Sequence, residues 1–252
     1  MDIFTDERLK KELEAFRKAG KRNRDKYENL TSVVDKKSSD AAVDLAYIDA
    51  QRTMKGIGKN FPQQKSDAIN DIKEALHKYF SDPAPESETA FDSVHKSLCN
   101  TWCKKFNGSD IGTYGKAQKI INMAFKYLFC CNDAKEYRAH FKYCHMPLDS
   151  ITLEWYKRKV DVEKKEYTWS KIKYNEYVEI QKNIRDYLNG SADTPLVKEF
   201  KVWPETQKEL AAEVFLSGLR DDLSLEKMWD MSLNTKYEHI IDALKSEIEK
   251  SK

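Results

Sequence analysis

Two short segments contain residue types that could form a nucleophile and an electrostatic partner for it. In the first, Lys116 and Lys119 follow Gly115. In the second, Asp149 follows a proline and a leucine and precedes a serine. A lysine attacks carbon as a free amine when its pKa is lowered, and burial beside an apolar helix face is expected to lower it. A nearby carboxylate stabilises positive charge on the attacked group. The two segments therefore indicate amine-based covalent chemistry.

The same segments resemble the helix-hairpin-helix DNA glycosylase superfamily, most closely the archaeal 8-oxoguanine DNA glycosylase branch, which is also all-helical. In that superfamily a glycine-rich hairpin leads into a helix with a lysine nucleophile. A proline–hydrophobic–aspartate–Ser/Thr stretch then supplies the catalytic carboxylate at the start of a later helix. Lys119 stands in the lysine position and Asp149 in the aspartate position, 30 residues further on. Ala117 replaces a customary glycine, and the spacing of Gly112 and Gly115 favours Lys116 as the nucleophile instead.

The resemblance covers about residues 112–158 and implies a DNA glycosylase/lyase-like protein that excises a flipped, modified base. It makes Lys119 the nucleophile, with Lys116 in reserve, and Asp149 the electrostatic partner. The hairpin would hold the DNA backbone through Gly112, Thr113, Tyr114 and Gly115. Basic and aromatic residues are interleaved downstream, as in a nucleic-acid groove. This pattern predicts that Lys157, Arg158 and Lys159 contact the DNA and that Trp155 and Tyr156 stack on the flipped base.

A second interpretation needs no catalysis. Lys116 and Lys119 would lie on the solvated face of a helix, and Asp149 would satisfy free N–H groups at a helix start. The chain would then be a non-catalytic helical protein that binds another macromolecule. The sequence leaves open whether the protein is an enzyme, and it names no oligomeric state.

Cysteine and histidine could provide a metal site instead. The five cysteines have no close C-x-x-C pair, and adjacent cysteines on a helix point in different directions. We therefore favour five buried, reduced thiols over a metal site and predict no cofactor, while the sequence leaves open whether the cysteines bind a metal. Together with a start that lacks the features of a secretory signal, the thiols predict a cytoplasmic protein. The cysteines are Cys99, Cys103, Cys130, Cys131 and Cys144.

The elements that position these residues are expected to be helices. Only 8 glycines and 6 prolines occur in 252 residues, too few for the turns of a sandwich or barrel, and 34% of residues are charged. A net charge of +2 names no partner, and no apolar stretch approaches the length of a membrane span. Apolar periodicity predicts helices over 5–30, 66–80, 88–102, 116–131, 134–143, 150–158, 174–188 and 205–249, and another through Val43 to Ala50.

We thus predict an all-α protein, mainly one globular multi-helix domain with a helix-hairpin-helix-like element. The stretch 81–87 contains two prolines and small polar residues, which is typical of a linker. It would separate an N-terminal helical lobe, residues 1–80, from the remaining domain, residues 88–252. A loop through Pro195 and Pro204 is expected before the last helix.

Overall fold

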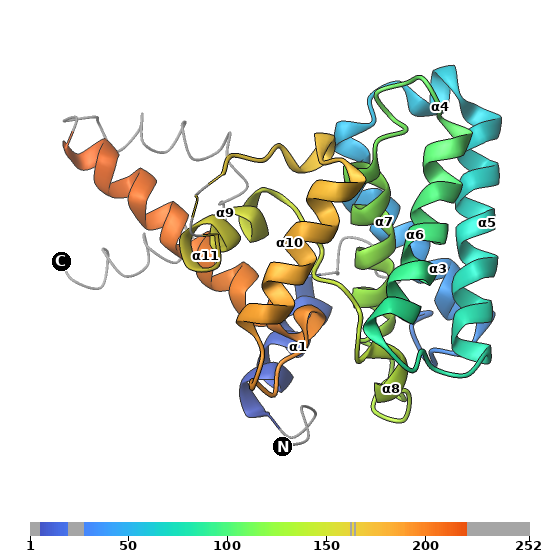
Figure 1. The fold of residues 1–252 in the computed structure, drawn as a ribbon, viewed down its shortest axis with the longest axis horizontal. Coiled ribbons are helices and arrows are strands. Elements are labelled where there is room, and N and C mark those ends of the chain that lie inside the picture. Colours follow the sequence, from blue (N-terminus) through green and yellow to red (C-terminus); the bar gives the residue numbers. More distant parts are fainter. Residues whose placement is uncertain (1–5, 20–27, 162, 164, 221–252) are drawn as a thin grey trace. The chain divides into compact units, whose positions relative to one another are not determined.

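The computed structural model describes residues 6–19, 28–161, 163 and 165–220 (Figure 1). Within these residues it contains ten α-helices, two short 3-10 helices and no strand, which confirms the all-α prediction. The α-helices are α1 (Glu7–Ala19), α3 (Lys36–Ala50), α4 (Ile57–Asn60), α5 (Pro62–Ser81), α6 (Glu88–Lys105), α7 (Tyr114–Leu128), α8 (Arg138–Phe141), α9 (Ser150–Lys159), α10 (Tyr174–Tyr187) and α11 (Pro195–Arg220). The 3-10 helices are η3 (Gln51–Thr53) and η4 (Trp169–Lys171).

The chain divides into two compact units, residues 1–201 and 202–252. All the candidate residues lie in the first unit. The predicted linker 81–87 falls on the loop between α5 and α6, which comprises residues 82–87, and Ser87 caps α6 by accepting a hydrogen bond from the N–H of Ala90. Its role as a boundary between two lobes stays a prediction.

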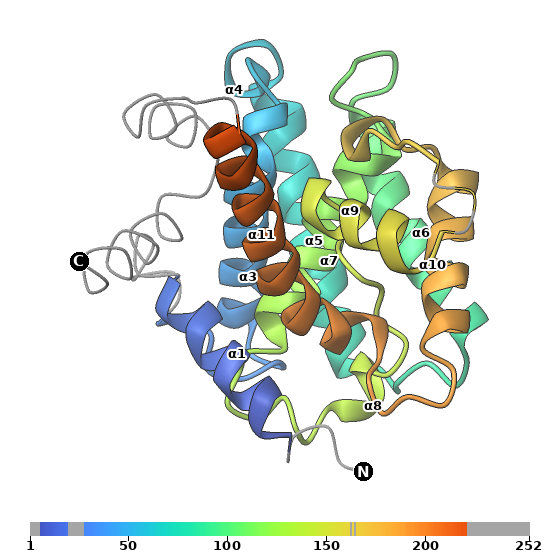
Figure 2. The same cartoon turned by 90° about the vertical axis from the view of Figure 1, so that its left-hand side faces the viewer.

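Helix α7 is buried along its whole length, including its lysines, glutamine and asparagine. Helices α3 and α6 pack along it, and α5 packs against both of them (Figures 1 and 2). Ile120, Ala124 and Leu128 have no exposed surface and supply the apolar contacts. The expectation of a solvated face for Lys116 and Lys119 is wrong, because each is only 7% exposed. Buried polar groups need partners, so the side chains of α7 must find them inside the protein.

Several predicted helix boundaries were wrong. Residues 28 and 29 form a turn and residue 30 is not helical, where the end of the first helix was expected. Helix α5 begins at Pro62, a residue suited to a first turn. Helix α11 begins at Pro195, where Leu196 and Val197 are buried and favour helix over the expected loop. Pro204 lies inside α11 and lacks the N–H for one helical hydrogen bond. The predicted helical run beyond residue 220 lies outside the described residues.

Candidate functional site

The segment that leads to Asp149 lies against α7 in a matched register. Cys144–Leu148 has no regular secondary structure, and two glutamine side chains bind its backbone. Gln118 of α7 accepts from the N–H of Leu148 at 3.1 Å and donates to its carbonyl at 2.8 Å. Gln181 of α10 does the same for Met146, at 3.2 and 2.8 Å. Each glutamine therefore satisfies a buried backbone N–H and C=O, as a neighbouring strand would.

The register of the Gln118 clamp places the next residue along each segment face to face. Lys119 Nζ lies 2.9 Å from Asp149 Oδ2, and their side chains are 8% and 9% exposed. Asp149 is also the N-cap of α9, because its Oδ1 accepts from the N–H groups of Ile151 and Thr152 at 2.9 and 3.0 Å. Thr152 completes a capping box by accepting from the Asp149 N–H at 2.8 Å. The carboxylate is thus held from both sides.

Electrostatics keep Lys119 charged in this arrangement. Burial acts to lower its pKa, but the field of Asp149 and the hydrogen bond to it outweigh burial, with smaller contributions from Glu199 and Asp49. The pKa of Lys119 is therefore raised, and the expectation that burial lowers it is wrong for the closed pair. The amine becomes a nucleophile only when Asp149 no longer holds its proton.

The side chain of Lys116, the reserve nucleophile, does not reach Asp149. Its Nζ donates to the carbonyl of Asp110 in the loop before α7. Burial lowers the pKa of Lys116, against an opposing contribution from Asp110. The structure therefore brings Lys119, and not Lys116, to Asp149.

Other backbone segments of the same chain pack directly against the glycine-rich hairpin. A Cβ on Gly115 would lie 2.0 Å from the carbonyl oxygen of Trp169, and the Gly115 N–H donates to Ile172 O at 3.0 Å. Thr113 Oγ1 donates to Ser170 O at 2.7 Å. A Cβ on Gly112 would lie 2.4 Å from the carbonyl oxygen of Phe106. The two glycines thus permit close backbone packing within the chain.

Tyr114, the remaining hairpin residue, is buried, with its hydroxyl 3.4 Å from His95 Nδ1.

Two of the three basic residues of α9 form ion pairs with glutamates. Lys157 forms an ion pair with Glu166, and Arg158 with Glu154 at 2.6 Å, while Lys159 is exposed. Surface pairs of this kind can be exchanged for a phosphate at little cost.

The two candidate stacking residues pack toward α10. Trp155 is 6% exposed and meets the ring of Tyr187 edge-on, with centroids 5.8 Å apart. Tyr156 is 1% exposed, and its hydroxyl accepts from Asn183 at 2.8 Å. Neither ring is presented to solvent as a stacking platform.

A buried polar network beside the pair was not predicted. Asn122, one turn after Gln118 on α7, donates to the hydroxyl of Tyr177 at 2.8 Å and to Gln118 Oε1 at 3.0 Å. The Tyr177 hydroxyl lies 2.8 Å from His145 Nδ1, and His95 stacks on the Tyr177 ring at an interplanar angle of 6°. The network therefore joins α6, α7, α10 and the segment before Asp149.

Asp92 and Arg185 connect this buried network to the protein surface. Asp92 Oδ1 lies 2.8 Å from His145 Nε2, and Arg185 binds both oxygens of Asp92, at 3.0 and 2.7 Å. Burial lowers the pKa of His145 to about 4, against an opposing hydrogen bond to Asp92. The pKa of Asp92 is held well below its usual value, because His145 and Arg185 outweigh its partial burial. The sequence signal was Gln118 and Asn122 at i, i+4 in a mostly apolar helix.

Among the described residues, no group of three or more histidine, cysteine or acidic side chains is placed to hold a metal ion. All five cysteines are free thiols, and all but Cys103 are buried. None of the described helices has the length and apolar character needed to cross a membrane.

Comparisons with protein-family models, with curated proteins and with solved structures find no match to this chain.

Proposed function

We propose that this protein is a DNA base-excision protein of the glycosylase/lyase type, with Lys119 as its nucleophile. One observation carries the proposal: Lys119 Nζ lies 2.9 Å from the Oδ2 atom of the carboxylate that caps the following helix. The chemistry requires an amine and a carboxylate within reach of one reacting carbon. A lysine and an aspartate 30 residues apart meet here through buried backbone clamps, and that position is fixed before any substrate binds.

The proposed reaction begins when a flipped nucleotide enters between the two side chains. Without its ion pair, Lys119 is left with burial as the main influence, so its pKa falls and the neutral amine is populated. The amine nitrogen forms a bond to C1′ of the deoxyribose as the C1′–base bond breaks and the base leaves with the bonding electrons. Asp149 stabilises the positive charge on the sugar. The attached nitrogen gives one proton to the departing base and its second proton to O4′ as the C1′–O4′ bond breaks, which leaves a Schiff base between Lys119 and C1′.

The proposed DNA surface includes the outer face of α6. A shallow hollow of about 310 Å³ follows this face, and no carboxylate lines it. The two lysines, Lys96 and Lys104, are two helical turns apart and can approach successive phosphates, while hydroxyl and amide groups supply hydrogen bonds. The lining residues are Ser93, Lys96, Ser97, Asn100, Thr101 and Lys104.

A second candidate function is a non-catalytic helical protein that binds another macromolecule. It is favoured by the closure of the Lys119–Asp149 pair, in which both charged groups are more than nine-tenths buried and satisfied within the chain. In that case the pair locks α9 to α7 and takes no part in chemistry.

Borohydride trapping separates the two functions, because it reduces the Schiff base to a stable protein–DNA adduct. We expect an adduct with duplex DNA that carries an oxidised purine. It should be lost in Lys119→Gln and kept in the matched variant Lys116→Gln on the same helix. Asp149→Asn should slow adduct formation with little effect on DNA binding.

Lys119→Gln leaves Asp149 buried without its partner, so folding has to be controlled. The double variant Lys119→Gln/Asp149→Asn removes both charges, and circular dichroism verifies its helix content. A folded wild-type protein that gives no adduct on any damaged duplex would refute the enzyme and leave the binding protein. An adduct that persists in the folded double variant would refute Lys119 as the nucleophile.

A further inference from the structure

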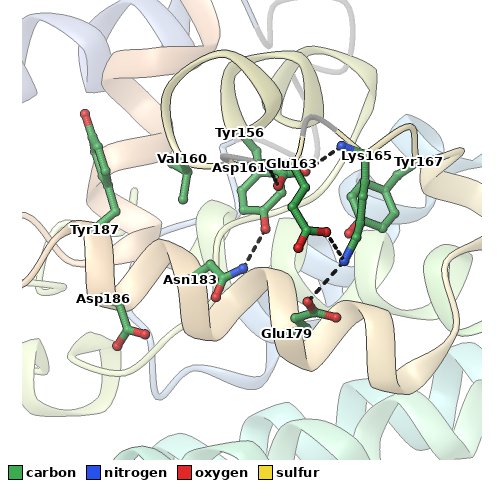
Figure 3. A pocket seen from close by; sticks show the side chains of 10 residues that line it. All are labelled: Tyr156, Val160, Asp161, Glu163, Lys165, Tyr167, Glu179, Asn183, Asp186 and Tyr187. Atoms are coloured by element: carbon green, nitrogen blue, oxygen red, sulfur yellow. Dashed lines mark hydrogen bonds and ion pairs between the residues drawn. The ribbon is translucent and has the colours of Figure 1, made fainter.

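A second hollow, of about 390 Å³, lies between the end of α9, the chain that follows it and α10 (Figure 3). Neither Lys119 nor Asp149 lines it. Its walls combine three tyrosine rings with four carboxylates, one ammonium group and one amide. The lining residues are Tyr156, Val160, Asp161, Glu163, Lys165, Tyr167, Glu179, Asn183, Asp186 and Tyr187.

The tyrosines stand on two sides of this hollow. Tyr156 and Tyr167 are neighbours, with ring centroids 6.3 Å apart and planes at 64°. Tyr187 stands on the other side of Asn183 in Figure 3, and 50% of it is exposed. Among the described residues that makes it the most exposed large hydrophobic side chain. An aromatic face left open beside a hollow is suited to an organic cation, which the ring quadrupole attracts.

The charges of the walls select the same ligand. Four carboxylates face one ammonium, so the lining carries an excess of three negative charges at neutral pH. Asp161 uses both oxygens on backbone N–H groups of Glu163 and Lys165, and Asp186 pairs with Lys182 at 2.6 Å. A phosphate or carboxylate ligand would be repelled, which separates this hollow from the proposed DNA surface.

The chain's own ammonium marks the place of the cation. Lys165 Nζ lies 2.9 Å from Glu163 Oε2 and 3.6 Å from Glu179 Oε1, one carboxylate from each wall (Figure 3). The three side chains are about half exposed or more, so the contacts are exchangeable and weak. Asn183 donates to the Tyr156 hydroxyl, and its amide oxygen makes no hydrogen bond to the described residues. That oxygen can accept from an incoming N–H.

We infer that this hollow binds an alkylammonium group, which replaces Lys165 between Glu163 and Glu179 while the Tyr167 ring, which lies beside Lys165 in Figure 3, contacts its methyl or methylene carbons. The group can belong to a free amine or to a lysine side chain of a peptide, and both present the same chemistry. The inference does not depend on the proposed DNA chemistry, since no residue is shared with the Lys119 site.

Calorimetric titration of the full chain tests the inference. The probes are tetramethylammonium, spermidine and a peptide that contains trimethyl-lysine. We expect saturable binding with one site per chain, weakened about tenfold by Glu179→Gln, a loss typical of one charged contact. Lys165→Gln should tighten binding severalfold because it removes the internal competitor. Lys171→Gln is the matched control, since Lys171 is an exposed lysine of η4 that does not line the hollow, and should leave the affinity unchanged.

The three probes distinguish a protein partner from a small-molecule ligand. Tight binding of the peptide with weak binding of both free amines identifies a protein partner, and the reverse identifies a small-molecule ligand. The absence of saturable binding for every probe, in both the wild type and Lys165→Gln, would overturn the inference. Equal affinities in the wild type, Glu179→Gln and Lys165→Gln would overturn it as well, because binding would then occur elsewhere.

Discussion

Replacing Gln118 by methionine should both destabilise the fold and release Lys119. Methionine keeps the length of the side chain but removes the two hydrogen bonds to Leu148. The N–H and C=O of that buried residue would lose their partners, at roughly 1–3 kcal/mol for each unsatisfied group. Repacking recovers part of the loss, so we expect the free energy of unfolding to fall by about 2–4 kcal/mol. Gln63→Met, at an exposed position of α5, is the matched control and should change it by less than about 0.5 kcal/mol.

The same substitution should change the reactivity of Lys119. The clamp sets the register that places Asp149 opposite the lysine, and Asp149 is what raises the pKa of the amine. With the carboxylate displaced, the pKa falls and the amine reacts at lower pH. Reductive methylation followed by mass spectrometry measures the labelling rate at Lys119 across pH. We expect the midpoint of that rate to shift downward in Gln118→Met and to stay unchanged in Gln63→Met.

Both measurements are needed to refute the reasoning. A loss of stability with an unchanged labelling midpoint would show that Gln118 supports the fold without positioning Asp149. Wild-type stability and wild-type labelling together would show that the Leu148 backbone finds other partners. Either result can be obtained whether or not the protein acts on DNA.

Three further predictions concern the buried charges and glycines. Lys119→Met should cost about 3–5 kcal/mol in urea unfolding, and Lys119→Met/Asp149→Ser clearly less, because serine still caps α9 and no buried charge is left alone; equal losses would contradict a buried pair. His145 has a lower pKa folded, about 4, than unfolded, so the unfolded state binds more protons and stability should fall by about 3 kcal/mol as pH drops from 6.5 to 4. His145→Gln should flatten that pH dependence, and an unchanged slope would show that another group causes it. Gly115→Ala should lower the melting temperature by several degrees, because its Cβ would meet Trp169 O at 2.0 Å, whereas Gly58→Ala, with nothing within 4 Å, should not.

Lys119 and Asp149 were paired from the sequence, through a resemblance that stays a prediction, and their side chains lie 2.9 Å apart in the structure. The helix start at Ser150 also followed from local chemistry, since Asp149 caps it. The environment of the pair could not be predicted in the same way. Lysines at positions 116 and 119 look like a solvated face, and only the packing of α3 and α6 on α7 shows that they are buried. The sign of the pKa shift then followed from a 2.9 Å distance, which no sequence pattern contains.

The two glutamines were missed for a related reason. Gln118 and Gln181 are ordinary helix residues in sequence, and their role appears only where an irregular segment without strand partners passes between two helices. The loop predicted through Pro195 and Pro204 was wrong for the opposite reason. The two prolines are a strong local signal for a loop, but the burial of Leu196 and Val197 outweighs it and favours a helix. Local propensity is a weak guide wherever tertiary burial opposes it.

The energy needed to open the Lys119–Asp149 pair decides whether a closed site is compatible with catalysis. Separating a buried pair costs about 3–5 kcal/mol, so free protein would hold the open state in roughly one molecule in 10²–10⁴. Non-specific DNA binding supplies about 5–8 kcal/mol, which exceeds that cost. DNA can therefore open the site if it binds the open state preferentially, and labelling of Lys119 should then accelerate when an unreactive duplex is added. The exposed Lys159 serves as an internal reference for general shielding. Slower labelling of both lysines would mean that DNA covers the surface without opening the pair, and the lysine would then be structural.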